Sequence, residues 1–128
     1  HSVCTTSTHD MTPLRNWWKE DPEKTQRYYN HVLQRIGEAP DECTAEIVAQ
    51  IISNHLKTRS MLTIIPLQDW FAMDDSIKRK DIESERINVP ANSTHYWRYR
   101  MHITLEQLLQ ADNLNNKIVS LIKEAGRK

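Results

Sequence analysis

The sequence predicts an α/β fold with parallel strands, in which helices form most of the chain. Two segments rich in β-forming residues, 2–8 and 61–65, are separated by amphipathic helical patterns. Two strands joined by a helical crossover form a parallel βα unit. The second segment, Met-Leu-Thr-Ile-Ile, is apolar on both faces, which is typical of a strand covered on both sides. Two strands cannot provide such cover alone, so we expect this chain to be part of a larger α/β protein.

Three helices are predicted between the two strands. Thr12 before a proline is a favourable N-cap for the first. The second begins at Asp21, also before a proline, and is expected to end at Gly37. The third begins near Thr44. The side chains expected to be buried are Leu14, Trp17 and Trp18 in the first helix, Tyr28, Tyr29, Val32, Leu33 and Ile36 in the second, and Ile47, Val48, Ile51, Ile52 and Leu56 in the third.

The region after the second strand divides into an irregular part and a helical part. Residues 66–93 mix charges, prolines and short helical patterns, so we expect irregular structure with one or two short helices. Thr104 and Gln107 have the spacing of a capping box, which opens a last helical region that Gly126 closes. The apolar surface of this region is expected to come from Leu108, Leu109, Leu114, Ile118, Leu121 and Ile122.

The composition excludes several classes of protein. The 128 residues suit one domain, and 17 Lys and Arg balance 17 Asp and Glu, so nothing favours nucleic-acid binding. No apolar run approaches the roughly 18 residues of a membrane span, and we expect no signal peptide. Cys4 and Cys43 are far apart and match no zinc spacing. We therefore expect free thiols in a reducing, cytoplasmic location, with no metal and no cofactor.

Polar residues follow both predicted strands, where ligand sites form in parallel α/β folds. His9 and Asp10 come after the first strand, and an Asp there can bind substrate hydroxyls or balance positive charge. The alternative is that Asp10 only caps the following helix. Gln68 and Asp69 follow the second strand in the same way.

A second group of candidates lies near the C-terminus. The segment 95–100, His-Tyr-Trp-Arg-Tyr-Arg, alternates aromatic rings that can stack on sugars with arginines that donate planar hydrogen bonds. The alternative is a structural cluster in which Arg stacks on the rings. Arg86, Asn88 and Pro90 lie in the preceding loop, and we expect Arg86 to fix that loop through hydrogen bonds.

Several of these segments occur in the order of a known family. They are residues 5–10 (Thr-Thr-Ser-Thr-His-Asp) with Leu14, Trp17 and Trp18 behind them, 66–69 (Pro-Leu-Gln-Asp), 85–90 (Glu-Arg-Ile-Asn-Val-Pro) and 92–101 (Asn-Ser-Thr-His-Tyr-Trp-Arg-Tyr-Arg-Met). Together they resemble the 4-alpha-glucanotransferase family (amylomaltase, disproportionating enzyme). The segment 92–101 resembles the form found in the longer plant-cytosolic-type enzymes and their bacterial relatives. The resemblance covers nearly the whole chain.

The resemblance implies a fold and a reaction. The fold is a (β/α)₈ TIM barrel, with residues 3–7 as strand seven and 61–65 as strand eight, so that residues 1–128 form an incomplete C-terminal part of the barrel. The reaction is retaining transfer of α-1,4-glucan segments through an Asp nucleophile and a Glu acid/base, both expected outside this chain. The ligands implied are maltooligosaccharides or α-glucans.

The resemblance also implies roles for residues of this chain. Asp10 would be a third carboxylate that stabilises the transition state, and His9 would bind sugar hydroxyls. Gln68, Asp69 and Trp97 are further candidates for substrate binding, although the resemblance favours a structural role for the segment 96–100. The three remaining candidates, Arg86, Asn88 and Pro90, are expected to form a structural motif.

Two other functions remain open at this point. The chain could be a stand-alone module that holds a glycan with Trp97 and Tyr99, or a helical interaction domain without a ligand. If it is a piece of the barrel, we expect the isolated chain to be inactive. We also expect it to self-associate or to rearrange its strand region, because its strands would lack neighbours. We expect no nucleic-acid or membrane partner.

Overall fold

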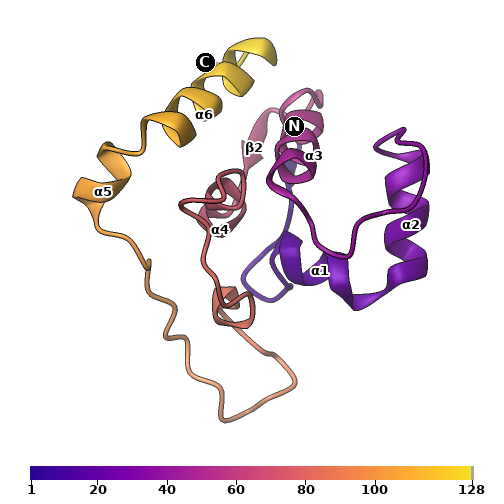
Figure 1. Ribbon diagram of the computed structural model, residues 1–128. Helices are drawn as coiled ribbons and strands as arrows, with labels where there is room; N and C mark the ends of the chain where they lie inside the picture. Colours follow the sequence, from indigo (N-terminus) through magenta and orange to yellow (C-terminus); the bar gives the residue numbers. More distant parts are fainter. Residues whose placement is uncertain (128) are drawn as a thin grey trace.

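The computed structural model describes residues 1–127. Helices are the main component, as predicted, and two short strands lie among them (Figure 1). The elements are β1 (Val3–Thr5), α1 (Leu14–Glu20), α2 (Pro22–His31), α3 (Ala45–Leu56), β2 (Leu62–Ile64), α4 (Leu67–Phe71), the 3₁₀ helix η1 (Glu83–Glu85), α5 (Leu105–Leu109) and α6 (Asp112–Glu124). Figure 1 shows α2 at one side of the molecule and α5 and α6 at the other, with α3 and α4 between them.

The two strands pair in parallel, as the sequence predicted. Val3 pairs with Leu62 and Thr5 with Ile64, so the carboxyl ends of both strands lie at the same edge. The described residues do not cover the second strand on both faces, because Leu62 is 50% exposed and Ile64 57% exposed. This agrees with the expectation that two strands cannot provide such cover alone, and no third strand pairs with β1 or β2 within residues 1–127.

The predicted starts of α2 and α3 are confirmed, whereas that of α1 is wrong. The Asp21 side chain accepts a hydrogen bond from Lys24 N, and Thr44 Oγ1 accepts one from Ile47 N. The first helix instead has Pro13 at its N-cap, without a side-chain cap. Thr12, the predicted cap, donates its hydroxyl to Glu20 Oε1 at 2.6 Å.

The second helix ends at His31, six positions before the predicted end at Gly37. The chain turns away because Gln34 takes a positive φ of 56°, and the Asn30 amide donates to the Arg35 carbonyl at 2.8 Å. As a result Ile36, predicted to be buried, is 99% exposed. A side-chain amide that bonds to the backbone offers the chain an alternative to helical hydrogen bonds.

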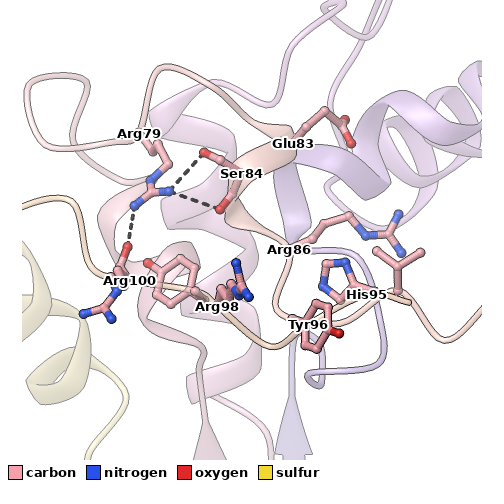
Figure 2. A pocket seen from close by; sticks show the side chains of 10 residues that line it. Arg79, Glu83, Ser84, Arg86, His95, Tyr96, Arg98 and Arg100 are labelled. Atoms are coloured by element: carbon pink, nitrogen blue, oxygen red, sulfur yellow. Dashed lines mark hydrogen bonds between the residues drawn. The ribbon is translucent and has the colours of Figure 1, made fainter. Parts of the chain in front are cut away.

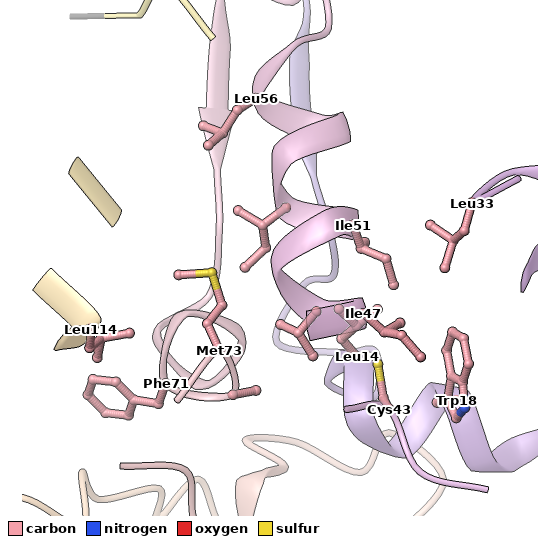
Figure 3. Close-up of a cluster of buried hydrophobic side chains, with 13 residues drawn as sticks. Leu14, Trp18, Leu33, Cys43, Ile47, Ile51, Leu56, Phe71, Met73 and Leu114 are labelled. Atoms are coloured by element: carbon pink, nitrogen blue, oxygen red, sulfur yellow. The ribbon is translucent and has the colours of Figure 1, made fainter. Parts of the chain in front are cut away.

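The hydrophobic core is centred on α3. All five side chains of its predicted apolar stripe, from Ile47 to Leu56, are buried. Figure 3 shows Trp18 and Leu33 on one side of this helix, and Phe71 and Leu114 from α4 and α6 on the other. The helix therefore joins the N-terminal and C-terminal parts of the chain in one core.

The predicted capping box of the last helical region is confirmed, because Thr104 Oγ1 and the Gln107 side chain exchange hydrogen bonds with each other's backbone N–H. The region consists of two helices, α5 and α6. Lys117 Nζ donates to the Met73 carbonyl at 2.9 Å, which ties α6 to the end of α4. Arg127 donates to the carbonyls of Leu56, Thr58 and Ser60 and thereby closes the C-terminal end of α3.

Both cysteines are free thiols, as predicted. Cys4 lies on β1 and is half-buried, whereas Cys43 belongs to the core. Burial raises the pKa of the Cys43 thiol to about 12. Among residues 1–127, no helix has the length and apolar character needed to cross a membrane.

Candidate functional site

The carboxyl ends of β1 and β2 meet beside two polar segments. His9 and Asp10 lie in the turn between β1 and α1, and Gln68 and Asp69 lie in the first turn of α4, directly after β2. The parallel pairing of the strands therefore brings together two pairs of candidates that are about sixty positions apart in the sequence. This edge is the place where parallel α/β folds form their ligand sites.

Asp69 is 1% exposed and joins three elements at this edge. Its Oδ2 accepts a hydrogen bond of 2.5 Å from the Thr6 hydroxyl, next to β1, and its Oδ1 accepts one of 3.0 Å from the backbone N–H of Leu14, the first residue of α1. Asp69 thus supplies the cap that α1 lacks from its own sequence neighbours. Burial is the main influence on the pKa of this carboxyl and raises it.

Gln68, 4% exposed, supports the loop that follows α4. Its amide donates to the backbone carbonyl of Glu85, in η1, at 3.0 Å. The Glu85 carboxylate accepts a hydrogen bond of 2.8 Å from Arg15 Nη1 of α1. Arg15 Nη1 also donates to the Arg79 carbonyl at 2.8 Å. The hydrogen bonds of the Gln68 and Asp69 side chains hold α1, α4 and η1 in one arrangement.

Arg15 and Glu85 form a buried ion pair, in which desolvation disfavours the ionised form of the Glu85 carboxyl. Both side chains are less than a tenth exposed. Desolvation raises the pKa of the Glu85 carboxyl to about 6, even though Arg15 opposes that change. A second oxygen of this carboxylate, Oε2, is buried and accepts no hydrogen bond in the described chain.

Asp10 has its carboxylate in solvent and is held by an amide. Asn88 Nδ2 donates to Asp10 Oδ1 at 2.6 Å, and the neighbouring His9 places Nε2 3.4 Å from Asp10 Oδ2. The Asp10 side chain remains 54% exposed. The alternative in which Asp10 only caps α1 is wrong, because that helix begins after Pro13 and its first N–H bonds to Asp69.

The ring of Trp97 packs beside this pair. Its centroid lies 4.8 Å from that of the His9 imidazole, with the planes tilted by 47°. Trp97 is nevertheless 59% exposed, so one part of its ring is open to a ligand. The structure therefore brings together His9, Asp10, Asn88 and Trp97. Sequence analysis named all four but predicted no contact between the loop of Asn88 and the turn of Asp10.

The loop with Arg86 and Pro90 is fixed by other residues than predicted. No hydrogen bond from the Arg86 guanidinium is present in residues 1–127, and its Nε is buried without a partner. Arg79 instead donates to the carbonyl and the hydroxyl of Ser84 at 3.2 and 3.1 Å, and to the carbonyl of Arg100 (Figure 2). Pro90 lies in an exposed turn closed by a hydrogen bond from Asn92 N to the Val89 carbonyl.

The groups around Asp10 can form hydrogen bonds and stacking contacts with a polar ligand. An exposed carboxylate and an imidazole can accept or donate hydrogen bonds, and an aromatic ring beside them can cover the apolar face of a sugar. No group of three or more His, Cys, Asp or Glu that could hold a metal ion occurs in the part of the chain that the structure describes.

Comparisons with known proteins agree on one family. The family model described as 4-alpha-glucanotransferase matches residues 1–106. The 4-alpha-glucanotransferase DPE2 of Oryza sativa subsp. japonica is 39% identical over 126 residues, which cover 98% of this chain and 13% of that protein. The 4-alpha-glucanotransferase of Chlamydia trachomatis serovar D is 31% identical over 123 residues, or 94% of this chain and 22% of that protein.

A solved structure has the same fold over this region. The amylomaltase from Streptococcus agalactiae in complex with acarbose superposes with a TM-score of 0.71 at 18% sequence identity. The match covers 98% of this chain and 22% of the amylomaltase chain. The present chain therefore spans less than a quarter of the length of each of these three relatives.

Proposed function

Because the chain belongs to the 4-alpha-glucanotransferase family, we propose that it is the part of such an enzyme that supplies Asp10 to the active site. The full-length protein transfers α-1,4-glucan segments between maltooligosaccharides or α-glucans by retaining double displacement. Two carboxylates about 5 Å apart, the nucleophile and the acid/base, perform the bond-breaking steps of that mechanism. In this proposal both belong to the rest of the protein.

The two strands are strands seven and eight of a (β/α)₈ barrel in this proposal. Their parallel pairing supports it, as does the position of the polar residues at their carboxyl ends, where such barrels place their active sites. The exposure of Val3, Leu62 and Ile64 supports it as well, because further barrel strands would cover these apolar side chains. Residues 1–128 would then form one incomplete part of the catalytic barrel.

In this proposal Asp10 stabilises the positive charge of the transition state and does not itself break the glycosidic bond. The sugar at the cleavage site gains positive character in the oxocarbenium-like transition state. A fixed carboxylate beside it stabilises that charge more than it stabilises the neutral ground state, which lowers the barrier. The observation that carries this role is the 2.6 Å hydrogen bond from Asn88, since it orients a carboxylate that is otherwise in solvent.

The neighbouring residues divide into those that contact sugar and those that support the site. His9 binds a sugar hydroxyl, and Trp97 covers the face of a ring. Asp69 and Gln68 are positioning residues in this proposal, because their hydrogen bonds join β1, α1, α4 and η1.

The proposed location of the protein is the cytoplasm.

The test is the Asp10→Asn substitution in the full-length protein, with disproportionation of maltotriose as the assay. Loss of a charge that acts in the transition state corresponds to about 3 kcal/mol, so we expect the rate to fall at least about a hundredfold. The melting temperature should stay unchanged, because Asp10 is exposed. Asp41→Asn, which changes an exposed carboxylate elsewhere, is the matched control. A near-wild-type rate for Asp10→Asn would overturn the assignment.

One observation favours a second candidate function, a stand-alone glycan-binding module. Trp97 presents a ring that is 59% exposed beside polar groups. Calorimetric titration of the 128-residue chain with a maltodextrin would distinguish the two functions. Monomeric binding that Trp97→Ala abolishes would favour the module, and an absence of binding would favour the glucanotransferase.

A further inference from the structure

A cavity lies beside the segment that carries Asn88 and Trp97. It has a volume of about 520 Å³ and opens between η1 and the extended segment 95–100. Figure 2 shows Arg79 on one side of it, Arg86 and His95 on the other, and Arg98 between them. We call it the arginine pocket, defined by Arg79, Arg86, Arg98 and Arg100.

The arginine pocket is strongly basic in a chain whose formal net charge is zero. Glu83 is the one carboxylate among its lining residues, and its Oε1 already accepts a hydrogen bond of 2.9 Å from the Asn16 amide. In the described chain, none of the four arginines forms an ion pair, whereas the neighbouring Arg15 pairs with Glu85. Glu83 and the nearby Glu85, whose carboxyl interacts with Arg79, offset only part of the charge of the four arginines. The remaining like charges repel one another, so an anion that joins them would be stabilised.

Two of the guanidiniums are held by aromatic rings. Arg98 lies over the ring of Tyr96 at 4.9 Å, and Arg79 lies over the ring of Tyr99 at 5.4 Å. Stacking occupies the flat face of a guanidinium and leaves the N–H groups at its edge. Arg79 uses these groups for Ser84 and the Arg100 carbonyl, whereas those of Arg98 donate no hydrogen bond in residues 1–127 and remain for a planar or tetrahedral anion. Arg86 contributes a third guanidinium, which donates no hydrogen bond in residues 1–127 and whose Nε is buried without a partner.

The arginine pocket shares its wall with the Asp10 site. Trp97 contacts His9 on one side of the segment, and its neighbours Tyr96 and Arg98 line the pocket. Asn88 bonds to Asp10, and the adjacent Val89 lines the pocket. A ligand in the pocket would therefore contact the same short segments that hold the Asp10 carboxylate.

We propose that the arginine pocket binds the phosphate group of a phosphorylated sugar. The guanidiniums of Arg86 and Arg98, which line the pocket and donate no hydrogen bond in residues 1–127, match the charge and the acceptor oxygens of a phosphate monoester. The volume of about 520 Å³ accommodates a sugar as well as the phosphate. The phosphate part rests on the pocket alone, whereas the sugar part rests on the proposed glucan chemistry of the neighbouring site. Free sugar phosphates and phosphate groups carried on a glucan share this chemistry.

The test uses the full-length protein and isothermal titration calorimetry at low salt. The probes are glucose 6-phosphate, inorganic phosphate, glucose, and a maltooligosaccharide with and without a phosphate ester. Glucose 6-phosphate should bind, glucose should not, and added salt should weaken the binding. Loss of one charged hydrogen-bonding group should weaken it about tenfold or more in Arg86→Gln and in Arg98→Gln. Arg27→Gln, which removes an exposed arginine on α2, should bind as the wild type does.

Each outcome bears on a separate part of the proposal. An absence of glucose 6-phosphate binding, or equal affinity in wild type and Arg98→Gln, would overturn the proposed phosphate site. Because Arg98 is exposed, this variant tests binding without a threat to folding. Inorganic phosphate that binds as tightly as glucose 6-phosphate would overturn the sugar part and support the phosphate part. Tighter binding of the phosphorylated maltooligosaccharide than of glucose 6-phosphate would identify a glucan as the source of the group. Phosphate binding by a protein without transfer activity would refute the proposed function and leave the phosphate site intact.

Discussion

Asn88 donates a hydrogen bond of 2.6 Å from its side-chain amide to the carboxylate of Asp10, which lies 78 positions earlier in the chain. This contact joins the turn after β1 to the loop after η1. The helix η1, from which this loop departs, is held by Gln68 and Arg79, which donate to the carbonyls of Glu85 and Ser84, and by Arg15, which donates to the Glu85 carboxylate. The orientation of an exposed carboxylate is therefore set by a chain of contacts that reaches into the core.

Asn88→Ala should lower the glucan-transfer rate of the full-length protein about tenfold. The reason is the loss of a hydrogen bond to a charged group, typically about 1.5 kcal/mol or more. Asn88→Asp should lower the rate further, because two carboxylates would then face each other. Initial rates of maltotriose disproportionation measure the effect, with the exposed Asn54→Ala as the matched control. Equal rates for Asn88→Ala and Asn54→Ala would show that the amide does not position Asp10.

Asp69→Ala should destabilise the protein by about 2–4 kcal/mol. The substitution leaves the Thr6 hydroxyl and the Leu14 N–H without their acceptor in a buried setting, and each loss is of the order of 1–3 kcal/mol. Urea unfolding followed by circular dichroism measures the change. Asp41→Ala, at an exposed position, should leave the midpoint unchanged. Equal midpoints for the two variants would mean that Asp69 does not support the fold.

Glu85→Gln should remove a pH dependence of stability. The pKa of Glu85 is about 6 in the folded chain, against 4.5 for the free side chain. The folded state therefore binds the proton more tightly, so the free energy of unfolding falls as pH rises from 4.5 through 6. One pH unit corresponds to about 1.4 kcal/mol, so Glu85 contributes at most about 2 kcal/mol to this fall.

Denaturant titrations of wild type and Glu85→Gln at several pH values test this expectation. The stability of the wild type relative to the variant should be greatest below pH 4.5, where Glu85 is protonated in both states, and should decrease until about pH 6. It should be constant above that value, where Glu85 is ionised in both states. Curves that stay parallel across this window would contradict a raised pKa.

The isolated 128-residue chain should transfer no glucan and should self-associate. A retaining mechanism requires a nucleophile and an acid/base, and Asp10 serves neither role in our proposal. Val3, Leu62 and Ile64 expose half or more of their apolar side chains on two short strands. Light scattering measures the mass, and Ile64→Lys should shift the chain towards the monomer. Transfer products from the pure chain, or a monomer at all concentrations, would contradict these expectations.

Local sequence signals predicted much of the fold. The apolar stripe of α3, the caps at Asp21 and Thr44, and the box formed by Thr104 and Gln107 depend on residues within a few positions of one another. Such spacings determine which backbone groups a side chain can reach, so the sequence alone reveals them. The same holds for the parallel strands, whose type follows from the helical connection between them.

Long-range partners were beyond such reasoning. Thr12 has the character of an N-cap, yet Asp69 performs that function from 55 positions away. The end of α2 depends on side-chain amides that bond to loop carbonyls, and no periodicity encodes that competition. The contact of Trp97 with His9 likewise arises only after the loop has been anchored. The position of His9 and Asp10 after a strand could be predicted, but their neighbours could not.

Because Cys43 is buried, its rate of alkylation would report how often the core opens. Alkylating reagents attack the thiolate, and a thiol with a pKa of about 12 provides almost none at neutral pH. Modification must therefore await a fluctuation that exposes the start of α3, whereas Cys4 on the half-buried β1 does not depend on that event. Mass spectrometry of an iodoacetamide time course would resolve two phases, and the slow one would report how often the native core opens.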